Sequence, residues 1–224
     1  MFRHFEAFSV AFTLVLTAPA AALDIYGCGA DVRSGEVGQL QADLDCTFPT
    51  PLGTYAGVIL ESGAVLQMNG HTIDGSASGT GVHCMRGRCA IIGPGVITGS
   101  GVAITGYRAR IEVSGVTLSD NLGMIDDTDG TVSLTNVSAS QASGLGIRAG
   151  KVAVQNVTVD MSDAGNCIMS QRGVKGSDLT VSHCHEGVSS LHGSVRLDHL
   201  DSVGNSIGVF AGGRVELANS AVSG

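Results

Sequence analysis

Short runs of alternating apolar and polar residues follow one another through most of this 224-residue chain, separated by Gly, Asn and Asp. The runs come in sets of three that align with one another: 144–147, 151–154 and 156–159, then 165–168, 173–175 and 178–181, then 187–190, 194–197 and 199–200. Alternation with a period of two is typical of β-strands that bury one face. We therefore expect three short strands per set and an all-β fold.

The sets recur with a nearly constant period, marked by a ladder of glycines at intervals of 20 to 22 residues. The ladder consists of Gly81, Gly101, Gly123, Gly144, Gly165, Gly187 and Gly208. A repeat of about 21 residues built from β-branched runs and Gly or Asn turns is one coil of a solenoid. We predict a single-stranded parallel β-helix of about seven coils, triangular in section. One inward row then stacks from coil to coil: Val82, Val102, Met124, Leu145, Asn166, Val188 and Val209.

The N-terminus has the pattern of a secretory signal. Arg3 and His4 precede an apolar stretch from Ala7 to Thr17, and Ala20-Ala21-Ala22 offers a cleavage site. The stretch is shorter than the about 20 residues of a membrane span, so we expect a soluble, secreted or periplasmic protein. The predicted organisation is a signal peptide at 1–22, an N-terminal cap at 23–55 and a β-helix at 56–224.

The chain stops directly after the strand-like residues 221–222. We therefore expect an uncapped C-terminal coil, as in a truncated fragment of a larger β-helix protein or in a protein that associates end to end.

Charge and cysteine content narrow the class of partner. Twenty acidic against twelve basic residues give a net charge of −8, and only two lysines are present. This balance argues against nucleic acid, whose phosphates need a basic stripe.

Six cysteines in an exported chain indicate disulfides, and a solenoid restricts the 15 pairings of six cysteines to the same or adjacent coils. We expect Cys28–Cys46, Cys84–Cys89 and, on consecutive coils, Cys167–Cys184. A zinc site of Cys184 with His183 and His185 is the alternative for the third pair, although its spacing fits no familiar zinc pattern.

The segment from Gly57 to Gly75, ending in Asn69-Gly70-His71-Thr72-Ile73-Asp74-Gly75, resembles the first coils of right-handed parallel β-helix repeat proteins of the pectate-lyase-like superfamily. Cys28 and Cys46 ahead of it are similar to the N-terminal cap of that family. The resemblance implies a right-handed solenoid that faces a polysaccharide, but it names no activity, because pectate lyases, polygalacturonases, alginate lyases, uronate epimerases, tailspikes and adhesins share the fold.

The catalytic motifs of the related hydrolases and epimerases are absent, apart from the pair Asp126-Asp127. A calcium-dependent lyase needs stacked acidic residues and an Arg or Lys base. One turn column offers both: Asp126, Asp127 and Asp129 as candidate Ca²⁺ ligands, and Arg108, Arg148, Arg172 and His192, with Asp129, as candidate uronate-binding residues. The candidate catalytic residues are Asp126, Asp127, Arg108 and Arg148. The alternative is a ladder of stacked opposite charges without a ligand.

A second column has polar residues that bind sugar hydroxyls or only form turns: Asp120, Asn121, Gln141, Asp163, His185, Glu186 and Asn205. We expect an exported, non-catalytic protein that binds a polysaccharide or a cell-surface partner and needs no cofactor other than, at most, Ca²⁺. The alternative is a polyuronate lyase or epimerase; absorbance of an unsaturated product on pectin, polygalacturonate or alginate would distinguish the two.

Overall fold

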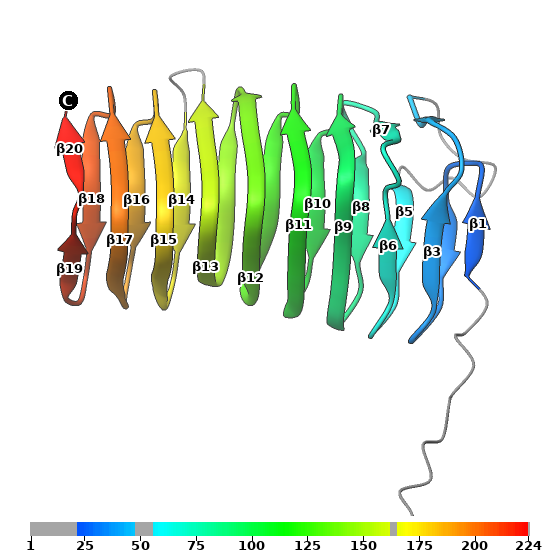
Figure 1. Ribbon diagram of the computed structural model, residues 1–224, viewed down its shortest axis with the longest axis horizontal. Coiled ribbons are helices and arrows are strands. Elements are labelled where there is room, and N and C mark those ends of the chain that lie inside the picture. Colours follow the sequence, from blue (N-terminus) through cyan, green and yellow to red (C-terminus); the bar gives the residue numbers. More distant parts are fainter. Residues whose placement is uncertain (1–21, 48–55, 162–164, 224) are drawn as a thin grey trace, which may run out of the picture.

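The computed structural model describes residues 22–47, 56–161 and 165–223, which wind as a right-handed parallel β-helix of about eight turns (Figure 1). The first ten strands are β1 (Leu23–Ile25), β2 (Ala30–Val32), β3 (Val37–Leu40), β4 (Leu44–Asp45), β5 (Ala56–Leu60), β6 (Val65–Gln67), β7 (Thr72–Asp74), β8 (Thr80–Cys84), β9 (Gly87–Thr98) and β10 (Val102–Gly106). The others are β11 (Ala109–Ser119), β12 (Gly123–Ala142), β13 (Leu145–Met161), β14 (Asn166–Ser170), β15 (Gly173–Ser182), β16 (Glu186–Ser190), β17 (Ser194–Val203), β18 (Ile207–Ala211), β19 (Val215–Ala218) and β20 (Ala221–Ser223).

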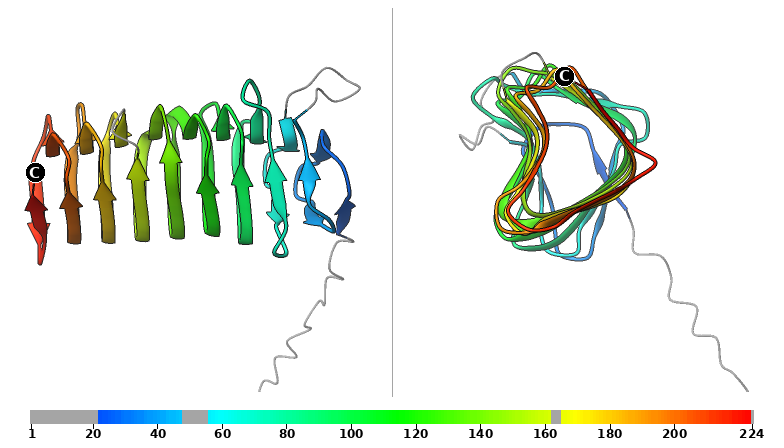
Figure 2. Two further views of the ribbon diagram at one scale, coloured as in Figure 1. Left: turned by 90° about the horizontal axis from the view of Figure 1, so that it is seen from above. Right: turned by 90° about the vertical axis from the view of Figure 1, so that its left-hand side faces the viewer.

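Each coil has three faces, as the alternating runs predicted. The first face contains β2, β5, β8, β10, the start of β12 and of β13, β14, β16 and β18. The second face contains β1, β3, β6, the first parts of β9, β11, β15 and β17, the middle of β12 and β13, and β19. The third face contains β4, β7, the last parts of the long strands, and β20. Seen along the axis, the first face bends inward (Figure 2).

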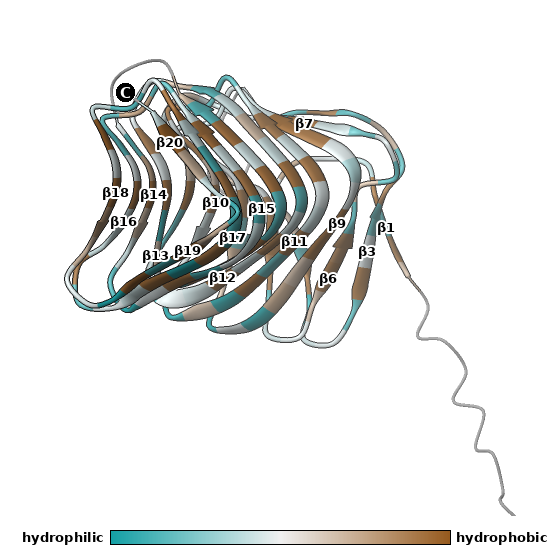
Figure 3. Cartoon of the chain, turned by 60° about the vertical axis from the view of Figure 1, so that its left-hand side comes forward, coloured by the Kyte–Doolittle hydropathy of each residue, from teal (hydrophilic) through white to brown (hydrophobic). Residues whose placement is uncertain are grey.

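Parallel pairing places equivalent residues in rows along the axis, and Figure 3 shows neighbouring strands coloured by hydropathy. The central inward row of the first face runs Ala30, Val58, Val82, Ile104, Ile125, Ile147, Ile168, Val188 and Val209. Burying one such aliphatic side chain contributes about 1.5–3 kcal/mol. The predicted row was right at Val82, Val188 and Val209 and wrong at its other four positions, because coils of unequal length shift the register. Asn166 lies outside this core row and donates to Glu186 Oε2 at 3.0 Å.

The glycine ladder is likewise not one structural column. Gly81 and Gly187 lie within first-face strands, whereas Gly101 and Gly144 lie in the turns that precede them. The second corner, between the second and third faces, is more regular. Its residues adopt the left-handed conformation in coil after coil: Asn69, Gly115, Asn136, Asn156, Asp178, His199 and Asn219 have φ between 48° and 65°. Gly, Asn and Asp tolerate this conformation best, so these residues mark the corner.

All three predicted disulfides are present: Cys28–Cys46, Cys84–Cys89 and Cys167–Cys184, with Cα–Cα distances of 5.7, 6.1 and 5.7 Å. They are consistent with an oxidising extracellular or periplasmic compartment. Strands β2, β3 and β4, in the segment expected to be a cap, pair in parallel with β5, β6 and β7. That segment therefore winds in the same register as the coils that follow.

The predicted signal peptide lies outside the described residues except for Ala22. No helix long and apolar enough to cross a membrane occurs in the described part of the chain.

Candidate functional site

Charge is segregated across the solenoid, although the whole chain is acidic. Every lysine and arginine of the described residues lies on the first face, the second face or the edge between them. The third face and its two edges carry carboxylates and histidines but no lysine or arginine among the described residues. Although the chain has a net charge of −8, the edge between the first and second faces carries Arg33, Arg86, Arg108, Arg172 and Arg214, and we call it the basic edge below.

A groove of about 690 Å³ lies on the second face beside this edge. Its floor consists of small residues from neighbouring coils: Thr131, Ser133, Ala153, Gly173 and Ser194. Its walls are long cationic side chains, all exposed: Arg110, Lys151, Arg172, Lys175 and Arg196. None of the lining residues is acidic. The hollow thus arises where short side chains stack in rows between long cationic ones.

The two lysines of the groove are the only lysines in the chain, and neither forms an ion pair within the described residues. Lys175 is in register with Ala153, two residues beyond Lys151 on the preceding coil. One coil step of about 4.8 Å and two residues along a strand separate their backbones by about 8 Å. The two ammonium groups can therefore contact two different anionic groups of one ligand.

Arg172 is held across the groove by a neutral acceptor. Its Nη2 donates to the backbone oxygen of Asp129, two coils away, at 2.6 Å. The side chain crosses directly above Gly150, where a Cβ atom would collide with Nη2. Because a carbonyl oxygen carries no formal charge, the positive charge of Arg172 stays uncompensated by this bond.

The three carboxylates expected to gather Ca²⁺ point in different directions. Asp126 lies on the first face in register with Arg148, whose Nε donates to Asp126 Oδ1 at 2.9 Å. Asp129 lies within β12, at the irregular stretch between Asp127 and Thr131, and pairs with Arg108 Nε at 3.4 Å. Asp127 is fully buried, so its predicted outward position is wrong. No three His, Cys, Asp or Glu side chains of the described residues are grouped so that they could hold a metal ion.

Asp127 is part of the coil interior and binds backbone. Its Oδ2 accepts the N–H of Ala109 from the preceding coil at 3.1 Å. Burial raises the pKa of Asp127 above its usual value, and backbone hydrogen bonds to Arg108 and Ala109 oppose this rise. Hydrogen bonding to Asp126 raises the pKa of Arg148. The Asp126–Arg148 pair therefore has the character of a neutralised charge ladder, the alternative interpretation of this column.

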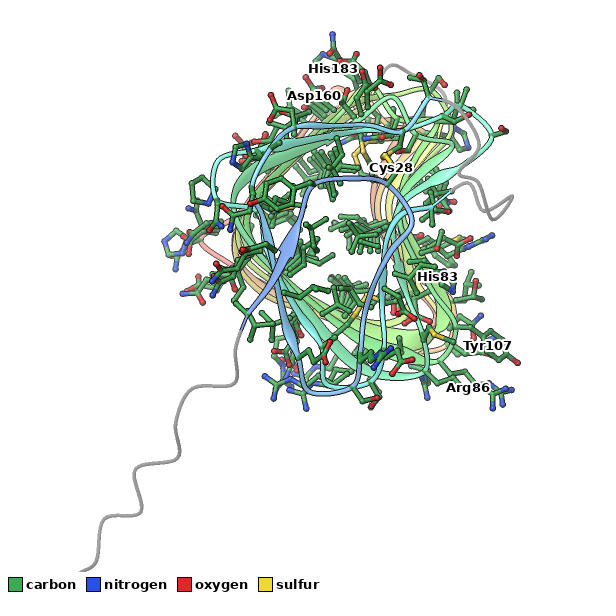
Figure 4. The ribbon with its side chains drawn as sticks, turned by 90° about the vertical axis from the view of Figure 1, so that its right-hand side faces the viewer. Cys28, His83, Arg86, Tyr107, Asp160 and His183 are labelled. Atoms are coloured by element: carbon green, nitrogen blue, oxygen red, sulfur yellow. A yellow bond between two sulfur atoms is a disulfide. The ribbon has the colours of Figure 1, made fainter. Side chains whose placement is uncertain are left out.

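Tyr107 stands at the basic edge between two guanidinium groups. Arg86 and Arg108 lie over its ring, with Cζ atoms 5.5 and 5.2 Å from the centroid. His83, on the same side of the molecule (Figure 4), shares a hydrogen bond of 2.8 Å with Thr105 Oγ1, and burial lowers its pKa. Cation–π contacts of this kind contribute about 0.5–1 kcal/mol at exposed sites, and here they stack three neighbouring side chains along the edge.

The remaining predicted site residues are dispersed. His192 is exposed at the basic edge. Asn121 and Asn205, from the second predicted column, are buried and bind backbone: their Oδ1 atoms accept the N–H groups of Ser100 and Cys184 at 2.9 and 2.8 Å. These two asparagines are turn-forming residues. Asp163 lies outside the described residues.

Of the predicted binding residues, only Arg172 lines the basic groove. Sequence reasoning missed Lys151, Lys175, Arg110 and Arg196. A signal was present: Arg88, Arg110 and Lys151 each stand near the start of a second-face run, and both lysines of the chain fall on consecutive coils. Correct strand register was needed to see that these side chains project from one face.

No protein-family model, curated protein or solved structure matches this chain.

Proposed function

We propose that this protein is an exported, non-catalytic β-helix that binds an acidic polysaccharide in the groove of its second face; some members of the pectate-lyase-like superfamily that it resembles also bind polysaccharides. The observation that carries the proposal is the groove with five cationic and no acidic lining residues in a chain with a net charge of −8. Guanidinium groups match carboxylate and sulfate oxygens with paired donors, and lysine supplies point charges. A shallow groove along the axis suits an extended chain.

Two observations favour a polysaccharide over nucleic acid. Three disulfides indicate an oxidising compartment outside the cytoplasm. The groove also has no aromatic lining residue, whereas proteins that bind single-stranded nucleic acid stack bases on aromatic side chains.

The carboxylates favour binding over catalysis. Asp126 is neutralised by Arg148, Asp129 pairs with Arg108, and Asp127 is shielded from any ligand by burial. The lyase prediction required these groups to converge on a cation beside the substrate. The arrangement supports a protein that holds a polymer without cleaving it.

Titration calorimetry with polygalacturonate, alginate and uncharged dextran tests the proposal. We expect the two polyuronates to bind and dextran not to bind. The double variant Lys151→Gln/Lys175→Gln should lose at least ten-fold in affinity, whereas Arg33→Gln/Arg86→Gln, which removes the same charge outside the groove, should keep binding. Equal losses in both variants, or tighter binding of a single-stranded oligonucleotide, would contradict the proposal. Absorbance of an unsaturated product should not rise.

A further inference from the structure

Two Arg–Glu–Arg clusters stand at the two ends of the groove. At one end, Glu112 binds Arg88 Nη2 at 2.7 Å and Arg110 Nε at 3.0 Å. At the other end, Glu216 binds Arg196 Nε at 2.5 Å and Arg214 Nε at 2.9 Å. In each cluster, the glutamate joins an arginine of its own coil to one of the preceding coil. Each end of the groove along the solenoid axis is therefore bounded by one Arg–Glu–Arg cluster.

The clusters divide the cationic side chains in and around the groove into one strongly charged middle part and two weakly charged ends. Each glutamate compensates one of its two arginines, so each cluster keeps a single positive charge. Between the clusters, Lys151, Arg172 and Lys175 have no carboxylate partner within the described residues. The attraction for an anionic chain is consequently greatest in the middle of the groove and falls at Arg110 and Arg196.

The two inner arginines are also positioned by these glutamates. Arg110 and Arg196 both line the groove, and both form their ion pair through Nε, which leaves their terminal amino groups to bind a ligand. Glu112 and Glu216 are only partly exposed, at 25% and 29% of their side-chain surface. A half-buried carboxylate that holds a guanidinium in one orientation reduces the entropy that the guanidinium loses on binding.

We infer that the groove is a length-limited site for a short anionic block of a polysaccharide, an inference that rests on the proposed function. Glu112 and Glu216 are the positioning residues that set the two ends of the site. Register links the coil of Arg110 to that of Arg196 through those of Thr131, Lys151 and Gly173. Four coil steps of about 4.8 Å give a site about 19 Å long. Uronates beyond this span meet only the two clusters, in each of which a glutamate compensates one of the two arginines.

Calorimetry with oligogalacturonates of increasing length tests the inference. We expect the affinity of the wild-type protein to rise until the oligomer spans about 19 Å and then to level off. In Glu112→Gln/Glu216→Gln, Arg88 and Arg214 become free to bind, so oligomers longer than this span should gain a few-fold in affinity. Asp74→Asn/Asp201→Asn, which removes the same charge from the third face, is the matched control and should level off like the wild type.

The outcomes separate the two proposals. A wild-type affinity that keeps rising with every added uronate overturns the length limit but leaves polysaccharide binding intact. A glutamate variant that behaves like the control overturns the role of Glu112 and Glu216. Absence of binding to every oligomer and polymer overturns the proposed function itself. Circular dichroism of each variant confirms that the β-helix is intact before binding is compared.

Discussion

At the scale of single residues, the buried carboxylate of Asp127 gives the clearest pH effect. Its pKa is raised by burial, so the folded state binds its proton more tightly than the unfolded state. The stability that this proton confers is complete below the unfolded pKa of about 3.9 and is lost as pH rises through the raised folded pKa. Asp127→Asn carries no charge and does not suffer this loss.

We therefore expect the unfolding free energy of Asp127→Asn, relative to wild type, to increase as pH rises from about 3.9 through the raised pKa. Urea unfolding over a series of pH values measures this difference. Asp201→Asn, exposed on the third face, controls for loss of one charge. A difference that is constant with pH, or that favours wild type as pH rises, would refute the assignment.

Asp160 should respond in the opposite direction. A hydrogen bond from His183 at 2.7 Å lowers the pKa of Asp160, so its stabilisation is present above the unfolded pKa and is lost as pH falls through the lower folded value. Because this carboxylate is about half exposed, solvent screens the pair and its contribution stays below about 1 kcal/mol. Asp160→Asn should be slightly less stable than wild type at pH 7 and equal to it in strong acid, as measured by urea unfolding.

At the scale of elements, the disulfides should differ in strength because they close loops of different length. Cys167–Cys184 spans 17 residues and Cys84–Cys89 only 5. The chain-entropy relation assigns about 3 kcal/mol to the longer loop and about 2 kcal/mol to the shorter. Chemical unfolding of Cys167→Ser/Cys184→Ser and of Cys84→Ser/Cys89→Ser tests this order. The reverse order would show that local packing, rather than loop entropy, decides the effect.

The elements also show what the sequence could and could not predict. The parallel β-helix, three faces per coil and all three disulfides followed from alternation, period and cysteine spacing. The corner of the second and third faces was predictable because Asn136, Asn156 and Asp178 are residue types that favour positive φ. The strand register on the first face was not predictable, because turns of different length separate coils whose strands have similar sequences.

That limit in register explains the errors at the candidate site. A shift of one position exchanges inward and outward side chains, which moved Asp127 from the predicted surface into the core and scattered the acidic cluster. The same uncertainty hid the basic groove, because its residues come from five coils and only correct pairing brings Arg110, Lys151 and Arg196 onto one face. The sequence showed which residues are acidic or basic, but it did not show on which face of the solenoid each of them lies.

At the scale of the whole molecule, net charge and local charge have opposite signs. If its charges were evenly mixed, a chain with a net charge of −8 and a pI near 5.2 would not bind to a sulfonated cation exchanger at neutral pH. Salt at about 0.1 M screens charges over roughly 10 Å, so a surface that touches the resin responds to its own cations rather than to carboxylates on the far side. The basic edge should then act as a cationic surface.

We expect the wild-type protein to be retained on such a resin at pH 7 and about 0.1 M salt and to elute as salt rises. Lys151→Gln/Lys175→Gln should pass through or elute much earlier, because it loses the two unpaired charges at the centre of the groove. Arg33→Gln/Arg86→Gln has the same net charge as the lysine variant, so a difference between their elution positions isolates placement from total charge. Identical elution of the two variants would mean that the groove is no stronger a cationic surface than the basic edge beside it.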